Sequence, residues 1–195
     1  MTTMHVQVDA KTGLWLEPKP VEVPKYLRKL RIGVMCSGNG TNFENIVRSC
    51  RQDEVVLMVY NKKHCGAKKR ANKLGIPNCH VKHCDEDDII KLFNAYNVDL
   101  IVLAGWMKIV SPKLIEAFPN RLINLHPSLL PKYKGLHAIE RALNSSDIVT
   151  GVSVHYVNEE LDGGELILQE EVPILPNDDV ESLTKAIQRK EYYLL

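Results

Sequence analysis

Short apolar runs alternate along most of the chain with segments whose apolar residues recur every three or four positions. The runs at 32–35, 55–60 and 100–104 are apolar throughout, which is typical of strands buried on both faces of a sheet. The segment 43–50 instead places its apolar residues at the i, i+3, i+4 and i+7 positions of one helical face. The pattern therefore predicts strands and helices in alternation.

The same pattern continues toward the end of the chain. It predicts helices at 67–74, 89–96, 112–118 and 137–143, a last helix from 177, and short strands at 78–81 and 121–124. Two alternating segments, 150–157 and 165–172, flank a turn at Asp162-Gly163-Gly164. We expect these two segments to form a hairpin-like pair at one edge of the sheet.

These elements predict an α/β fold, a doubly wound and mostly parallel sheet of about seven strands with helices on both faces. Ligands of such sheets bind beyond the carboxyl ends of the strands, at the point where the strand order reverses. In the common order, the strands at 32–35, 100–104 and 121–124 are neighbours there. The loops that follow these three strands are therefore the first candidates for a site.

Residues 1–29 differ from the rest of the chain. Between residues 16 and 25, prolines alternate with charged residues, which is typical of an extended arm rather than of a core element. We expect an N-terminal extension at 1–29 and one domain at 30–195.

The composition is that of an ordinary globular protein, with 45% hydrophobic and 25% charged residues. A net charge of +1 gives no electrostatic reason to expect a nucleic-acid partner. No apolar run approaches the roughly 18 residues of a membrane span, and the segment 1–8 lacks the features of a signal peptide. Five cysteines without framework spacing favour reduced thiols, so we expect a cytoplasmic protein without a membrane partner.

The first candidate loop is Ser37-Gly38-Asn39-Gly40-Thr41-Asn42, between a predicted strand and a predicted helix. Glycine lets the backbone approach a ligand closely, and the N–H groups at a helix start bind anions. The loop lacks the Lys of a Walker A motif and the third glycine of the dinucleotide fingerprint. We therefore expect it to bind a phosphate of a small ligand, and a plain glycine-rich turn is the alternative.

The second candidate segment is 124–131, with Asn124 and His126 two residues apart at the end of a predicted strand. Residues at this spacing point to the same side of a strand. A carboxamide and an imidazole aimed together can hold an oxyanion and move a proton. Asp162, on the turn before two glycines, would favour the charged imidazolium if it lay beside His126. An ordinary strand-to-turn junction is the alternative.

Two further segments carry weaker signals. Residues 104–110, with Trp106, Met107 and Lys108, offer an apolar wall and one cation to a flat heterocycle, although a core-facing loop is the alternative. The segment 79–84 holds two cysteines and two histidines, but its spacing is not that of zinc knuckles, and adjacent residues of an extended segment diverge. We therefore expect no metal.

Taken together, these segments resemble the folate-dependent formyltransferase family, and in particular its phosphoribosylglycinamide formyltransferases. The resemblance runs from about Arg31 to the end of the sequence. It rests on the loop 37–42, on 104–109, on 124–137, on Gly151-Val152-Ser153-Val154-His155 and on Leu161-Asp162-Gly163-Gly164, which occur in the family's order.

The resemblance implies roles for individual residues. It implies a catalytic trio of Asn124, His126 and Asp162; contacts of Gly40, Thr41 and Asn42 with the substrate phosphate; a folate site formed by Met107, Lys108, Ile109, Val110 and Asn124; and contacts of Gln188 and Glu191 with the second substrate. Lys108 stands where the family often has Arg, and lysine lacks the planar fork that a bidentate contact needs.

The implied reaction transfers a formyl group from 10-formyltetrahydrofolate, the co-substrate, to the amine of 5′-phosphoribosylglycinamide in purine (IMP) biosynthesis. The resemblance implies small-molecule partners, no metal, and a monomer or homodimer. The main alternative is formyltetrahydrofolate hydrolase (deformylase), which usually carries an N-terminal regulatory domain longer than 1–29. Methionyl-tRNA formyltransferase usually adds a second domain and a basic surface, and a non-catalytic nucleotide-binding module would not need the trio.

Overall fold

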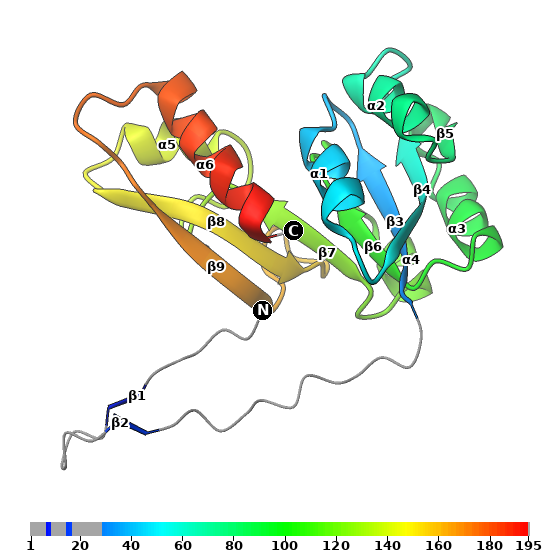
Figure 1. Cartoon of the computed structure of the whole chain (residues 1–195), viewed down its shortest axis with the longest axis horizontal. Coiled ribbons are helices and arrows are strands. Elements are labelled where there is room, and N and C mark those ends of the chain that lie inside the picture. The colour runs from blue at the N-terminus through cyan, green and yellow to red at the C-terminus, as the bar shows by residue number, and fades with distance from the viewer. Residues whose placement is uncertain (1–6, 9–14, 17–28, 195) are drawn as a thin grey trace.

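The computed structural model describes residues 7–8, 15–16 and 29–194, and its main feature is one seven-stranded sheet (Figure 1). Its strands are β3 (Arg31–Cys36), β4 (Glu54–Tyr60), β5 (Asn78–His80), β6 (Leu100–Leu103), β7 (Leu122–His126), β8 (Val149–Tyr156) and β9 (Leu166–Pro173). The order across the sheet is β5-β4-β3-β6-β7-β8-β9. The predicted α/β class and the adjacency of the strands β3, β6 and β7 are confirmed.

Helices connect the strands and cover the sheet. They are α1 (Thr41–Ser49), α2 (Gly66–Leu74), a 3-10 turn at Lys82–Cys84, α3 (Glu86–Ala95), α4 (Pro112–Ala117), α5 (Ala138–Leu143) and α6 (Val180–Leu194). The strands from β5 to β7 pair in parallel, whereas β7 with β8 and β8 with β9 pair antiparallel. The hairpin-like pair predicted at one edge is therefore confirmed as β8 and β9.

The predicted N-terminal extension lies largely outside the described residues. Within it, β1 (Gln7–Val8) and β2 (Trp15–Leu16) pair antiparallel. The domain boundary that we expected at residue 30 stays a prediction.

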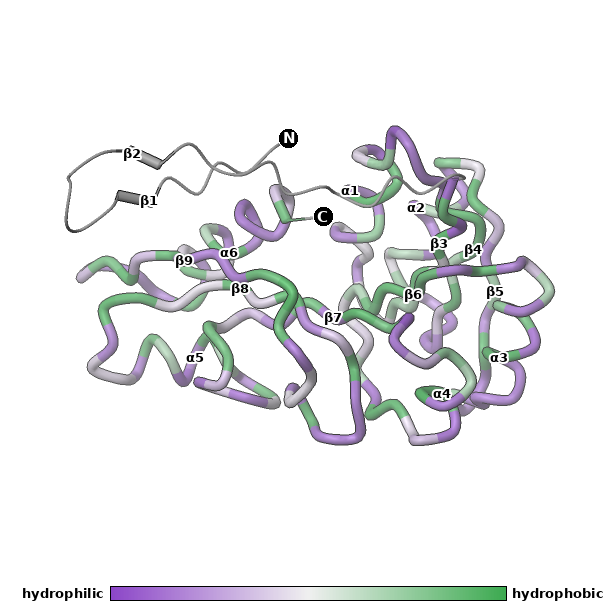
Figure 2. The backbone as a smooth tube through the Cα atoms, turned by 90° about the horizontal axis from the view of Figure 1, so that it is seen from below, coloured by the Kyte–Doolittle hydropathy of each residue, from purple (hydrophilic) through white to green (hydrophobic). Residues whose placement is uncertain are grey.

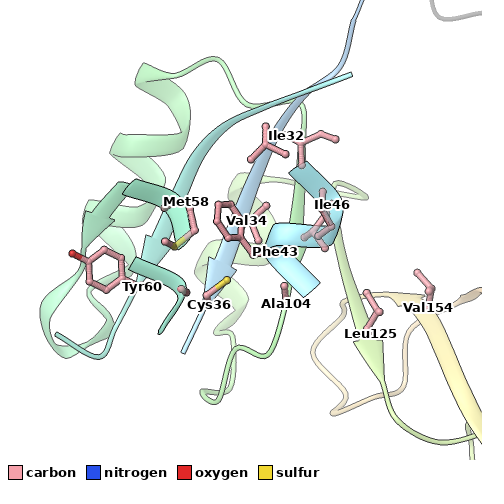
Figure 3. Close-up of a cluster of buried hydrophobic side chains, with 14 of the residues drawn as sticks. Ile32, Val34, Cys36, Phe43, Ile46, Met58, Tyr60, Ala104, Leu125 and Val154 are labelled. Carbon is pink, nitrogen blue, oxygen red and sulfur yellow. The ribbon is translucent and has the colours of Figure 1, made fainter. Parts of the chain in front are cut away.

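Two hydrophobic clusters lie on the two faces of the sheet because successive strand residues point to opposite sides. Val34 belongs to the cluster beneath α1, α2 and α6, which Figure 3 shows, while its neighbour Met35 belongs to the cluster beneath α3 and α4. Apolar residues accordingly follow the central strands, and many loop residues are hydrophilic (Figure 2). Burial on both faces explains why the parallel strands are apolar throughout.

The contact between Phe93 on α3 and Gly33 on β3 shows how closely the helices pack. A side-chain carbon on Gly33 would lie 2.6 Å from the Phe93 ring, so the absence of a side chain there lets the ring reach the sheet. The Phe93 ring is fully buried and meets Phe118 edge to face, with 6.1 Å between ring centroids.

Removal of the Phe93 ring should therefore destabilise the fold strongly. We expect Phe93→Ala to lower the free energy of unfolding by about 3–5 kcal/mol, through lost burial and the cavity that remains. Denaturant titration measures this change, and Tyr193→Ala, which truncates a side chain that is 85% exposed, is the control. A loss below about 1 kcal/mol for Phe93→Ala would contradict this packing.

Candidate active site

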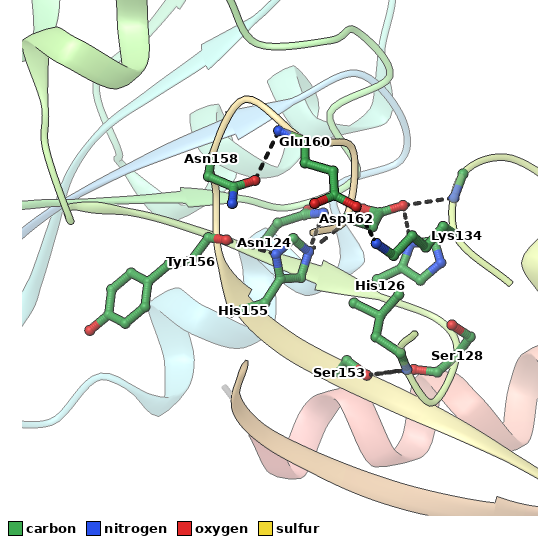
Figure 4. Close-up of polar contacts among 12 residues, drawn as sticks. Asn124, His126, Ser128, Lys134, Ser153, His155, Tyr156, Asn158, Glu160 and Asp162 are labelled. Carbon is green, nitrogen blue, oxygen red and sulfur yellow. Dashed lines mark hydrogen bonds and ion pairs between the residues drawn. The ribbon is translucent and has the colours of Figure 1, made fainter. Parts of the chain in front are cut away.

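The candidate site forms at β7, the strand at which the sheet changes from parallel to antiparallel pairing. Asn124 and His126 are two residues apart on β7, so their side chains share a face, as the sequence predicted. On the neighbouring antiparallel strand β8, His155 is the direct partner of Asn124. Directly opposed residues of an antiparallel pair also share a face. An amide and two imidazoles therefore project from one patch of the sheet (Figure 4).

Asp162 completes this cluster from the turn between β8 and β9. Its Oδ2 atom lies 3.3 Å from the Nδ1 atom of His126, and its Oδ1 atom lies 3.6 Å from the Nε2 atom of His155. The backbone N–H of Gly135 donates to the same Oδ2 atom at 2.7 Å. Asp162 is in the left-handed backbone region, with φ of 49°. The structure thus brings Asn124, His126 and Asp162 together.

Three side chains of the cluster are largely shielded from solvent, and this affects their charge. The side chains of His126, His155 and Asp162 are 8%, 2% and 6% exposed. Burial opposes ionisation of Asp162, but hydrogen bonds from His155 and from the Gly135 N–H, together with nearby imidazole charge, outweigh it and keep the Asp162 pKa below its usual value. Asp162 is therefore an anion at neutral pH.

Both ring nitrogens of His126 face hydrogen-bond acceptors. The Nε2 atom lies 2.8 Å from the backbone carbonyl oxygen of Tyr133, and a carbonyl can only accept. The Nε2 atom therefore carries a proton, and the Nδ1 atom is the one that faces the Asp162 carboxylate. The arrangement around His126 is therefore suited to a ring that donates from both nitrogens.

His155 is a buried part of the site that our sequence-based residue assignments missed. Its Nδ1 atom lies 2.8 Å from the Tyr156 carbonyl, and its Nε2 atom lies 3.4 Å from the Asn124 amide nitrogen. Its sequence signal is a pair of polar residues, Ser153 and His155, two apart on an otherwise apolar strand. The register between β7 and β8, which the sequence alone does not reveal, is what places His155 opposite Asn124.

The glycine loop leads into α1, whose N-terminus has no capping hydrogen bond from its N-cap residue, Gly40. Gly40 has a φ of 76°, and a side-chain carbon there would lie 2.6 Å from the Cα atom of Ala67, so only glycine fits. Glu44 in the first turn is bound by Arg48 and Arg70, and these bonds hold the Glu44 pKa below its usual value. The helix start is therefore suited to an anion.

Asn42 and Glu191, which the resemblance assigned to different ligand contacts, touch each other. The Asn42 amide donates to the Glu191 Oε2 atom at 3.0 Å, and Glu191 on α6 is 8% exposed. Burial raises the Glu191 pKa above its usual value, although the bond from Asn42 opposes this shift. The Asn42 Oδ1 atom is buried without a hydrogen-bond partner. Gln188, one turn earlier on α6, is exposed.

The loop after β6 is tied to the glycine loop. Ser37 donates its N–H to the Gly105 carbonyl at 3.2 Å, and its hydroxyl oxygen accepts from the Met107 N–H at 2.9 Å. Met107, Lys108 and Ile109 are exposed, so their side chains are accessible to a ligand. The Val110 side chain instead packs into the core beneath α3 and α4, so that side chain is not part of an exposed wall.

The segment 79–84 shows no grouping of ligands for a metal. The His80 ring stacks on Tyr60, with 5.4 Å between centroids, and the Cys84 sulfur accepts from the Asn61 amide. Across residues 29–194, no three His, Cys, Asp or Glu side chains are placed to share a metal ion. In the same part of the chain, no helix is both long enough and apolar enough to cross a membrane.

The sequence profile of the formyl transferase family matches residues 30–195. The chain belongs to this family. Phosphoribosylglycinamide formyltransferase of Haemophilus influenzae is 38% identical over 84% of the chain and 82% of that relative. The Escherichia coli enzyme of the same name is 37% identical, with the same two shares of coverage.

Solved structures give the same result. The phosphoribosylglycinamide formyltransferase of Bacillus halodurans superposes with a TM-score of 0.81 at 38% identity, over 84% of this chain and 90% of that one. Glycinamide ribonucleotide transformylase 1 of Symbiobacterium toebii gives a TM-score of 0.83 at 36% identity, over 85% and 84%. The Drosophila melanogaster trifunctional purine biosynthetic protein adenosine-3 is 37% identical, but the chain spans only 13% of its length.

The buried Glu191 carboxyl should make stability depend on pH. A carboxyl whose pKa is raised by folding stabilises the folded state fully at pH values below 4.5, its ordinary pKa. That stabilisation is lost as the pH rises through the raised pKa. Glu191→Gln stays neutral at every pH, and its amide can donate to the unpartnered Asn42 oxygen. We expect its unfolding midpoint, relative to wild type, to increase as the pH rises through the raised Glu191 pKa and to level off above it.

Thermal unfolding across this pH range measures the effect. Glu181→Gln, on an exposed position of the same helix, is the matched control and should follow the wild-type pH dependence. A Glu191→Gln curve parallel to that of wild type would show that Glu191 is not strained by burial.

Proposed function

We propose that this chain transfers the formyl group of 10-formyltetrahydrofolate to the amine of 5′-phosphoribosylglycinamide, a step of purine biosynthesis. One observation carries the proposal: the buried Asp162 carboxylate lies 3.3 Å from the Nδ1 atom of His126, on the face of the sheet that also presents the Asn124 amide. Similarity to phosphoribosylglycinamide formyltransferases over more than four fifths of the chain supports it.

The chemistry needs no covalent enzyme intermediate. The substrate amine attacks the formyl carbon, and negative charge develops on the formyl oxygen as a tetrahedral intermediate forms. The Asn124 amide has two N–H donors, and one of them can turn to this oxygen. An imidazolium at His126, whose two N–H groups face Tyr133 and Asp162, would add positive charge beside this oxygen. Donors fixed before the reaction stabilise such an oxyanion most effectively.

Asp162 has two roles in this mechanism. It keeps His126 charged and oriented through the Nδ1 contact, and it accepts the proton that the attacking amine loses, directly or through water. The proton then passes to the folate nitrogen as the intermediate collapses. Two substrates bound side by side supply much of the rate, because their reaction becomes effectively intramolecular.

The two substrates occupy opposite sides of the cluster in this proposal. Gly40, Thr41 and Asn42 receive the nucleotide phosphate at the start of α1, and Gln188 and Glu191 approach the rest of that substrate. Met107, Lys108 and Ile109 line the folate side, and Val110 contributes through its backbone. Asn42 donates one amide N–H to Glu191, so its second N–H is the donor that remains for a phosphate.

The remaining parts of the proposal concern partners and location. The partners are the two small molecules, the co-substrate is the formyl folate, and the protein is a monomer or homodimer in the cytoplasm. Two assays test the activity itself.

The first assay separates this function from the deformylase alternative. Purified protein is mixed with 10-formyltetrahydrofolate, with or without 5′-phosphoribosylglycinamide, and tetrahydrofolate release is followed. We expect release only when the nucleotide is present. Equal release without the nucleotide would identify a hydrolase, and no release in either mixture would identify a non-catalytic binder.

The second assay tests the role of Asp162. Asp162→Asn keeps the shape but loses the charge that holds His126 protonated, so we expect kcat to fall by at least about a hundredfold. The KM values should change by less than about threefold if the residue acts mainly in the transition state. Glu159→Gln, which removes an exposed charge from the same turn, should leave kcat unchanged. Near-wild-type kcat for Asp162→Asn would exclude the proposed role.

A further inference from the structure

The segment between β7 and α5 contacts the catalytic cluster through its backbone. Tyr133 in this segment is in the left-handed region, with φ of 56°. A residue other than glycine pays about 1 kcal/mol or more for this conformation, so surrounding contacts must maintain it. Its backbone carbonyl is the acceptor for the Nε2 proton of His126, at 2.8 Å.

The Tyr133 side chain is anchored away from the reacting groups. Its hydroxyl donates to the Oδ2 atom of Asp147 at 2.6 Å, and Lys132 bonds both oxygens of Asp147 at 2.9 Å. The hydrogen bond from Tyr133 is the main reason why the Asp147 pKa is below its usual value. Arg141 lies over the ring, 5.6 Å from its centroid. Tyr133 is therefore held at two points, by its hydroxyl bond to Asp147 and by the bond between its carbonyl and His126.

The same segment also holds the partner of His126. Two residues beyond Tyr133, the Gly135 N–H donates to the Asp162 Oδ2 atom at 2.7 Å. One short stretch of backbone thus contacts both members of the His126–Asp162 pair, through a carbonyl on one side and an N–H on the other. A shift of this stretch would disturb both groups together.

We propose that Tyr133 is a positioning residue: its carbonyl fixes the His126 ring, and the hydroxyl bond to Asp147 aims that carbonyl. A hydrogen bond at one imidazole nitrogen decides which nitrogen keeps its proton and how the ring is turned. With Nε2 held by Tyr133, Nδ1 is the working nitrogen, directed at Asp162 and the reaction centre. This inference rests on the proposed role of His126 in formyl transfer.

The test compares four variants of the full chain. Tyr133→Phe removes only the hydroxyl and keeps the ring under Arg141, while Asp147→Ala removes its acceptor. Asp147→Asn keeps an oxygen in place and serves as the conservative rescue. Lys132→Met removes the exposed ion pair to Asp147 and keeps the Tyr133 bond, so it is the matched control.

Turnover gives the first readout. We expect Tyr133→Phe and Asp147→Ala each to lower kcat on the order of tenfold, with KM values within about twofold, because a misplaced catalytic group costs rate rather than binding. The double variant should lose no more than either single variant, since both break one bond. Asp147→Asn should recover most of the loss, and Lys132→Met should match wild type.

The Nε2 proton of His126 gives the second readout, which needs no substrate. Its nitrogen-attached proton signal is assigned by nuclear magnetic resonance as the one that His126→Asn removes, and its exchange with solvent is measured. We expect faster exchange in Tyr133→Phe and Asp147→Ala, and wild-type exchange in Lys132→Met. Unchanged exchange in Tyr133→Phe would overturn the inference, as would a similar loss of kcat in Lys132→Met.

The two readouts separate failure of this inference from failure of the proposed function. Should the wild-type protein transfer no formyl group, the proposed function fails, and the exchange readout alone still decides whether Tyr133 holds His126. Faster exchange with wild-type kcat in Tyr133→Phe would show that the contact exists without a catalytic role, and would also overturn the inference.

Discussion

The site depends on the two different neighbours of β7. One neighbour, β6, pairs with it in parallel, and the other, β8, pairs with it antiparallel. β6 fixes β7 within the apolar sheet, so Asn124 and His126 project from a rigid strand. β8 runs the other way and places His155 directly opposite Asn124. The connection from β8 to β9 then returns to this face and places Asp162 beside His126. A parallel neighbour in place of β8 would require a helical crossover and could not place a tight turn there.

Burial of so many polar groups in one place carries a free-energy cost that the site offsets with partners. An unpaired buried ion would be strongly disfavoured. Asp162 has three partners, in His126, His155 and the Gly135 N–H, and His126 has an acceptor at each nitrogen. The partners of both side chains are therefore in place before any substrate binds. Such preorganisation is the property that oxyanion stabilisation needs.

Much of this arrangement could be predicted from the sequence because it follows from local periodicity. The apolar runs identified β3, β4 and β6, and the spacing of Asn124 and His126 placed both side chains on one face. The parts that could not be predicted depend on register and on contacts between distant segments. Nothing near His155 in the sequence indicates that it opposes Asn124, and nothing near Asn42 indicates that Glu191 lies 3.0 Å away. The left-handed backbone of Tyr133 could not be predicted either, because tyrosine has no preference for this conformation.

The contact between Asn42 and Glu191 joins the two ends of the domain at the proposed phosphate site. α1 begins there with free N–H groups, which favour an anion, while the buried Glu191 carboxyl nearby would repel one if it were charged. Burial raises the Glu191 pKa, which favours the neutral carboxyl and lowers that repulsion. A neutral Glu191 can also donate to the unpartnered Asn42 oxygen if the amide turns over. Burial of this one carboxyl thus links the packing of α6 to the charge near the start of α1.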